Sequence, residues 1–230
     1  MKTRSNPFSK VKVLYEDNHL LALFKPAGVP TQGDITGDPS LLDWARQWIG
    51  KKYKKPGAVY IGLVHRIDRP VQGVVLFART SKAAARLSEQ FRRHSVKKTY
   101  WAVIHGTPET RSGEASLYLV RRGSKSIPVS QEDPGGRYAR LSFNAIASAQ
   151  GYCLMEIAPL TGRHHQIRAT LADMGHPILG DIKYGSQRRI NPGEIALLAK
   201  SLTCLHPTRN QVITFESPIP DNWPWPPPED

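Results

Sequence analysis

Apolar runs of strand length, most of them separated by short turns, limit the folds open to this sequence more than any other feature. Residues 11–15 and 20–24 are separated by four polar residues, and residues 138–149 and 152–160 meet across Gln150-Gly151. Turns this short join antiparallel strands, because a parallel crossover needs about a dozen residues or more. Further strands are expected at 74–78, 98–106, 195–207 and 211–218. The sequence therefore predicts an α+β fold with a mixed, mainly antiparallel central sheet flanked by helices and loops.

Three segments have the pattern of amphipathic helices. Residues 40–50 begin with Ser40 three positions before Asp43, close to a capping box, and Gly50 is expected to end this helix. The basic run 51–55 is then expected to be a loop. A second helix is predicted to begin at Thr80 or Ser81, and a third to cover 164–175, with Gly175 at its exit.

The chain is strongly basic. Lys and Arg number 32 against 19 Asp and Glu, a formal charge of +13 over 230 residues. This surplus favours a polyanionic partner, most commonly nucleic acid, although a soluble protein of a basic proteome has the same sign. No apolar run approaches the ~20 residues that span a bilayer, and the N-terminus has no signal-peptide core, so we expect a cytoplasmic protein with no membrane partner. Cys153 and Cys204 lie in apolar runs and are expected to be buried free thiols.

One carboxylate stands out in the segment HRIDRPVQGVVLFA. Asp68 is flanked closely by arginines, and the ordinary interpretation of that pattern is a solvated ion pair. However, Gly73 follows it and leads directly into the apolar strand 74–78. A carboxylate held on a loop by a rigid strand is a frequent position for a catalytic group. Spacing and charge alone leave both interpretations open.

A second polar segment, TGRHHQIRATLADMG, surrounds the third predicted helix. Gly162 precedes the helix, so main-chain donors and Arg163 are placed to gather around an anion, with Arg168 further along. His164 and His165 suggest a metal at first sight. Adjacent residues of a helix point to different faces, however, and no third ligand stands at metal spacing. We therefore expect no metal site.

These motifs together resemble one family. HRIDRPVQG resembles the HRLDxxTSG signature of RluA-type pseudouridine synthases, and TGRHHQIRATLADMGHPILGDIKYG resembles their TGRxHQIRxH…GHPIxGDxxYG block. KKTYWAVIHG is similar to the KxYxAxVxG strand, and EDNHLLALFKPAGVPTQ to the usual opening. The signature's Leu is Ile67 here, its Thr-Ser is Val71-Gln72, and the last His of QIRxH is Thr170. The resemblance implies a single catalytic domain at 11–219 and an N-terminal extension at 1–10 without the family's frequent RNA-binding module. The composition of the Pro-rich tail at 220–230 favours a strap that packs its two Trp rings onto the domain, with a ligand for a proline-recognising partner as the alternative.

The resemblance also implies a reaction and its residues. The family breaks the bond between ribose and uracil nitrogen, turns the bound base and rejoins it through carbon, which requires no cofactor and no metal. By motif position, Asp68 is the nucleophile or base, Arg168 orients that carboxylate, and Tyr100 stacks on the flipped uracil. Arg66 fills the gap that the base leaves, and His65 is a structural partner of the loop. The base must first be extruded from its stack.

RNA, ribosomal or transfer, is the expected partner, and we expect a monomer. The residues predicted to contact RNA are His65, Arg66, Arg69, Arg163, Lys51, Lys52, Arg92, Arg93, Lys97 and Lys98. Two alternatives remain at this point. One is a non-catalytic RNA-binding protein or RNA chaperone; the other is a hydrolase in which Asp68 is the nucleophile and Arg163 and Arg168 hold a phosphate. The second would need a further carboxylate, histidine or metal beside Asp68.

Overall fold

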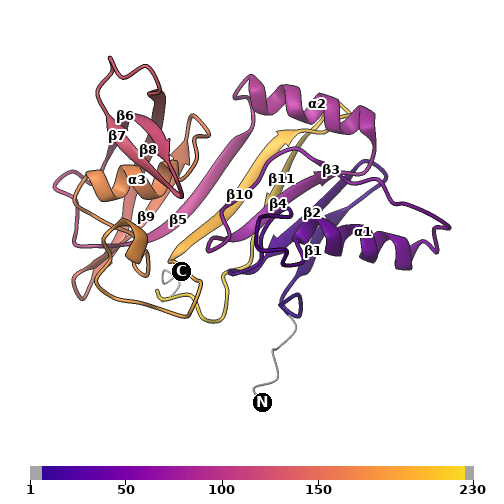
Figure 1. Ribbon diagram of the computed structural model, residues 1–230, viewed down its shortest axis with the longest axis horizontal. Coiled ribbons are helices and arrows are strands. Elements are labelled where there is room, and N and C mark those ends of the chain that lie inside the picture. The colour runs from indigo at the N-terminus through magenta and orange to yellow at the C-terminus, as the bar shows by residue number, and fades with distance from the viewer. Residues whose placement is uncertain (1–6, 226–230) are drawn as a thin grey trace. The chain divides into compact units, whose positions relative to one another are not determined.

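The computed structural model describes residues 7–225, and the chain folds into two compact units. The first unit comprises residues up to Lys97 together with Ala199–Pro218, and the second comprises Lys98–Leu198 with the segment from Ile219. Each unit is built on antiparallel strand pairs (Figure 1). The α+β prediction is confirmed.

The sheet of the first unit has the strand order β1-β2-β4-β10, with β3 paired to β4 and β11 paired to β10. The strands are β1 (Lys12–Glu16), β2 (Leu20–Lys25), β3 (Gly62–Leu63), β4 (Gln72–Ala78), β10 (Leu197–Leu205) and β11 (Val212–Glu216). β2 is buried along its whole length, and so is β4. Since successive side chains of a strand point to opposite faces, both faces of these two strands are covered.

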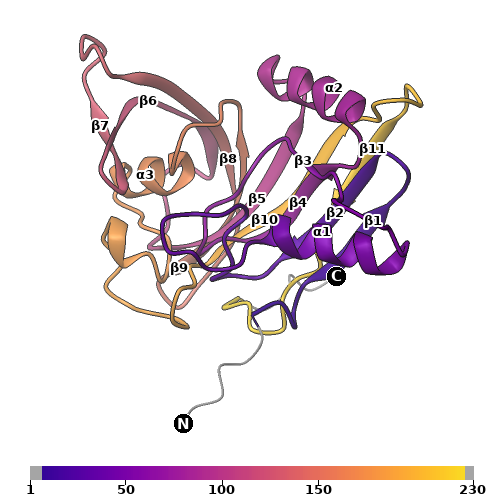
Figure 2. The same cartoon turned by 45° about the vertical axis from the view of Figure 1, so that its right-hand side comes forward.

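Helix α2 (Ser81–Arg92) covers one of these faces, along the sheet (Figure 2). Its Ala83 and Leu87 belong to one apolar cluster with side chains of β2, β4, β10 and β11, among them Leu20 and Leu76. The side chain of Thr80 caps the helix by accepting a hydrogen bond from the N–H of Ala83 at 3.2 Å. Of the two predicted caps, Thr80 is therefore the one used.

Helix α1 (Leu41–Lys52) has the predicted capping box between Ser40 and Asp43. It does not end at Gly50, as the sequence suggested. A glycine inside a helix costs only about 1 kcal/mol, and here the helix continues until the N–H of Tyr53 bonds to the carbonyl of Ile49. The predicted loop 51–55 therefore begins two residues late, because Lys51 and Lys52 form the last helical turn.

The second unit has the strand order β5-β9-β8-β6-β7, antiparallel at every step. The strands are β5 (Lys97–His105), β6 (Ser112–Arg122), β7 (Lys125–Val129), β8 (Arg137–Ala149) and β9 (Tyr152–Pro159), followed by α3 (Gln166–Asp173) and the 3-10 helix η1 (Ile182–Tyr184). The β8–β9 hairpin was predicted. The β6–β7 hairpin was not, because most of its side chains are exposed or half-buried and the apolar alternation is weak.

Several smaller expectations were also tested. Cys153 and Cys204 are buried free thiols, as predicted. Trp223 and Trp225 are buried, while residues 226–230 of the predicted tail lie outside the described part of the chain. Over residues 7–225, no helix is long and apolar enough to cross a membrane.

Candidate active site

Hydrogen bonds from a buried lysine hold the loop that carries Asp68. Lys25 ends β2 with no exposed surface, and its ammonium group donates hydrogen bonds to the carbonyls of Pro26 at 3.0 Å, Val29 at 2.7 Å and Arg69 at 3.1 Å. Burial lowers the pKa of Lys25 to about 7, and the negative charge of Asp68 opposes that shift. Three carbonyls match the three protons of an ammonium ion, so these contacts fix the residue next to Asp68.

Arg69 joins the loop of Asp68 to the loop that contains Gly28. Its Nε donates to the carbonyl of Gly28 at 2.9 Å, and the N–H of Gly28 donates back to the carbonyl of Arg69 at 2.9 Å. Its guanidinium also pairs with Asp38 at 2.5 Å and Asp34 at 3.6 Å. Gly28 has a φ of 82°, a conformation that favours glycine. Arg69, predicted to contact RNA, is thus already engaged within the protein.

The far side of the loop ends at a glycine that no other residue could replace without movement. Gly73 has a φ of 120°, and an added Cβ would lie 2.3 Å from the carbonyl oxygen of Ala199 on β10. Before it, the N–H of Val71 donates to the carbonyl of Asp68 at 3.1 Å and closes a turn. Val71 and Gln72, which depart from the family signature, are both buried. Main-chain bonds and burial therefore hold this turn without the two hydroxyls of the signature.

A threonine makes a further buried link to this loop. The Oγ1 of Thr31 donates to the carbonyl of Ile67 at 2.8 Å, and both residues are buried. Thr31→Val keeps the shape but leaves that carbonyl unpaired, so we expect the free energy of unfolding to fall by about 1–3 kcal/mol. Urea unfolding measures the loss. Thr203→Val, in an exposed Thr203–Thr214 pair, is the matched control and should change stability by no more than about 0.5 kcal/mol; equal losses in both variants would contradict the assignment.

The side chain of His65 contacts a strand and a helix of the first unit. Its Nε2 accepts a hydrogen bond from the N–H of Leu76 at 2.8 Å, and its ring stacks on Phe91 with centroids 4.9 Å apart. His65 therefore joins β4 to α2, and Arg66 beside it is exposed.

Arg168, in the second unit, forms a buried ion pair. Its Nε lies 2.6 Å from Oδ2 of Asp181 and its Nη2 lies 2.9 Å from Oδ1, with side chains 4% and 1% exposed. The guanidinium carbon also lies 5.0 Å from the ring centroid of Tyr184. A two-pronged contact of this kind fixes the plane of the guanidinium as well as its position.

The histidine pair differs from the prediction. His164 and His165 do not point apart: their rings stack with centroids 3.8 Å apart, because His165 precedes the helix with a left-handed φ of 53°. The side chain of Tyr184 lies 2.9 Å from Nδ1 of His165. Over residues 7–225, no group of three or more His, Cys, Asp or Glu is arranged to hold a metal.

His165 should make the protein sensitive to acid. Burial, followed by the charge of Arg168, lowers the pKa of His165 to about 2 from its usual 6.5. Since the unfolded chain binds a proton near pH 6.5 and the folded chain does not, the free energy of unfolding falls as pH drops below 6.5. The slope is at most about 1.4 kcal/mol per pH unit, and less here because the ring is only half-buried.

Unfolding experiments at pH 7.5 and pH 5 test this expectation. His165→Asn suits the left-handed backbone and removes the titrating group. The variant should lose less stability than the wild type between the two pH values. An identical loss in both proteins would show that other groups cause the acid sensitivity.

Tyr100 lies on β5 and is half-buried, opposite Ile157 of β9 in the strand register.

The remaining residues that were predicted to contact RNA belong to both units. Arg92 and Arg93 both pair with Glu89 on the exposed side of α2, and Nε of Arg163 donates to the carbonyl of Tyr138 at 2.9 Å. Lys51, Lys52 and Lys97 are exposed, whereas Lys98 is half-buried and burial lowers its pKa.

Known proteins identify the family to which these features belong. The sequence model of the RNA pseudouridylate synthase family matches residues 19–173, which contain Asp68, Tyr100 and Arg168. The chain belongs to this family. An uncharacterized RNA pseudouridine synthase of Zymomonas mobilis is 35% identical over 93% of this chain and 96% of its own length. The ribosomal large subunit pseudouridine synthase C of Buchnera aphidicola is 30% identical over 95% of this chain and 70% of its own.

A solved structure gives the same fold. Human RNA pseudouridylate synthase domain containing 4 matches with a TM-score of 0.77 at 22% identity, over 91% of this chain and 88% of the human one. The chain is thus an RNA pseudouridine synthase, an isomerase, and the RluA-type resemblance is confirmed.

Two residues of this synthase that matter for its site were not singled out from the sequence. Lys25 follows a fully apolar strand, where a buried cation is unusual, and Asp181 follows the apolar run of the GHPILGD motif. These two positions could have been noticed in the sequence. Their roles depend on Arg69, 44 residues after Lys25, and on Arg168, 13 residues before Asp181, and spacing alone does not identify these partners.

Proposed function

We propose that this synthase isomerises specific uridines of a structured ribosomal or transfer RNA, with Asp68 as its nucleophile or base. The observation that carries the proposal is the loop of Asp68. Lys25 and Gly28 both donate to the carbonyl of Arg69, Thr31 donates to that of Ile67, and Gly73 ends the loop against β10. A carboxylate carried beside a buried strand, on a loop whose main chain is held in this way, is in a position typical of a catalytic group.

The family reaction assigns the remaining roles. The carboxylate of Asp68 attacks or deprotonates the ribose–uracil unit, the bond to the ring nitrogen breaks, and the turned base is rejoined through carbon. The reaction neither oxidises nor hydrolyses its substrate, so the proposal includes no cofactor and no metal. Arg168, fixed in its plane by Asp181, has the role of orienting the catalytic carboxylate, and Tyr100 that of stacking on the uracil. Arg66, exposed and planar, fills the gap left by the extruded base.

The proposed RNA substrate is inferred from the net charge of the chain and from its similarity to a named relative. The formal charge of +13 suits a polyanion. The relative from Buchnera aphidicola is named for the large ribosomal subunit, and we propose RNA of this structured kind as the substrate class.

Two measurements test the proposal. RNA labelled with tritium at uracil carbon 5 should release the label when incubated with the purified synthase, because that carbon forms the new bond. Pseudouridine mapping of total RNA from cells with and without the gene should then reveal the sites that disappear. Absence of both tritium release and lost sites would leave only a non-catalytic RNA-binding role and overturn the proposal.

A further inference from the structure

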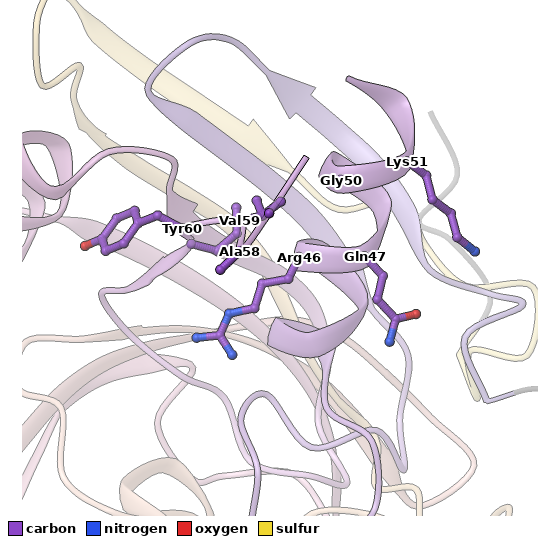
Figure 3. Close-up of a pocket in the computed structure, with 9 residues that line it drawn as sticks. Arg46, Gln47, Gly50, Lys51, Ala58, Val59 and Tyr60 are labelled. Atoms are coloured by element: carbon purple, nitrogen blue, oxygen red, sulfur yellow. The ribbon is translucent and has the colours of Figure 1, made fainter. Parts of the chain in front are cut away.

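An open groove lies beside α1 in the first unit, and the segment that forms one of its walls leads directly into the loop of Asp68. It has a volume of about 860 Å³ and runs between α1 and residues 57–61. Figure 3 shows Arg46 and Lys51 extending from α1 and Tyr60 from the neighbouring segment. Its residues are therefore contributed by a helix face and a loop that the catalytic proposal does not use.

The floor of the groove is small and apolar. Gly50 contributes no side chain, and a Cβ added there would lie 3.4 Å from a methyl group of Val59, so the loop packs directly on the helix at this point. Ile61 is 4% exposed and also lines the groove. An apolar lining of this kind accepts a planar group better than a charged one.

The surroundings of the groove are cationic. The stretch 41–61 contains Arg46, Lys51, Lys52, Lys54 and Lys55 but a single acidic residue, Asp43. Lys52 pairs with Glu16 at 2.5 Å, and Arg46 lies 3.5 Å from Asp43. Lys51 has no carboxylate within ion-pair distance among the described residues and is exposed. The local surplus of positive charge matches a phosphate backbone.

The groove also contains an exposed aromatic ring, that of Tyr60. Tyr60 is 50% exposed, and a Cβ added at Gly62 would lie 2.9 Å from its hydroxyl oxygen. An aromatic ring that is exposed in this way is a platform on which a nucleic-acid base stacks. Basic side chains beside such a platform are the usual combination in grooves that hold single strands.

We propose that this groove binds a single-stranded segment of the substrate RNA that flanks the target uridine, with one base stacked on Tyr60 and the backbone held by Arg46 and Lys51. The inference rests on the proposed function for the identity of the RNA. It adds a second contact region, which would select substrates by the unpaired nucleotides next to the target.

The affinity of a fluorescein-labelled 12-nucleotide oligouridine, measured by anisotropy at several salt concentrations, tests the groove. Tyr60→Ala should weaken binding about tenfold, whereas Tyr60→Phe keeps the ring and should bind like the wild type. Lys51→Gln should weaken binding and reduce the salt slope by about 0.7 for one lost phosphate contact. Lys82→Gln, the same change at an exposed position of α2, is the matched control.

A crosslinking experiment separates this inference from the proposed function. RNA containing 4-thiouridine beside the target should crosslink within residues 46–61. If the synthase releases tritium but Tyr60→Ala binds oligouridine like the wild type and no crosslink falls in 46–61, the groove proposal is overturned and the catalytic one stands. Binding of polyglutamate, a polyanion without bases, is measured with the same variants. If the variants lose affinity for polyglutamate but not for oligouridine, the groove binds an acidic protein and the proposal is equally overturned. Loss of oligouridine binding without any tritium release would support the groove and contradict the catalytic function.

Discussion

Asp68→Asn is expected to lower tritium release from labelled RNA by at least about 10³-fold while RNA binding persists. Asparagine has nearly the same shape as aspartate but cannot serve as a nucleophile or a base in this reaction. The loop should survive the change, because its fastening bonds from Lys25 and Thr31 go to main-chain carbonyls of Arg69 and Ile67. Single-turnover tritium release and a separate binding measurement distinguish the two effects.

Two controls sharpen this experiment. Asp68→Glu retains the carboxylate but moves it by one methylene, so activity should lie between those of the wild type and Asp68→Asn. Asp173→Asn makes the same chemical change at an exposed position of α3 and should leave activity unchanged. A fully active Asp68→Asn protein would contradict the proposal that Asp68 is the nucleophile or base.

Asp181→Asn should cause the largest loss of stability among the changes considered. Arg168 and Asp181 are 4% and 1% exposed, so removing the negative charge leaves a buried guanidinium without its ionic partner. Breaking a buried pair in this way costs about 3–5 kcal/mol. Urea unfolding should show a midpoint well below that of the wild type.

Asp173→Asn again provides the comparison, since it removes one carboxylate from the same unit at the surface. Its effect on the free energy of unfolding should stay within about 0.5 kcal/mol. If both variants lose the same amount, the ion pair between Arg168 and Asp181 contributes little, and the orientation of Arg168 must have another cause.

The sequence was a good guide wherever a local rule decides the structure. The capping box at Ser40, the cap at Thr80 and the hairpin across Gln150-Gly151 were all found where predicted, because each depends on residues close in the chain. Where a local signal is weak, the sequence misled. Gly50 did not stop α1, since a glycine inside a helix costs only about 1 kcal/mol and the N–H of Tyr53 still bonds to the carbonyl of Ile49.

The histidine pair shows the same limit at the site. The expectation that His164 and His165 point apart assumed a helix through both residues. The left-handed backbone at His165 places the rings in a stack instead, and Tyr184 and Ser126 from elsewhere in the chain hold them. Nothing in the spacing of two adjacent residues could reveal that conformation.

By itself, the sequence determined most of the strand and helix pattern, the basic charge and the family, because these are properties of composition, periodicity and motif order. It pointed to Asp68, but only as one carboxylate among arginines until the family signature gave it a role. The tertiary structure decided what holds that residue in place: a buried lysine 44 positions from Arg69 in the chain, a threonine and a glycine packed against β10. Such contacts depend on burial and on long-range approach of the chain, and neither is encoded in local spacing.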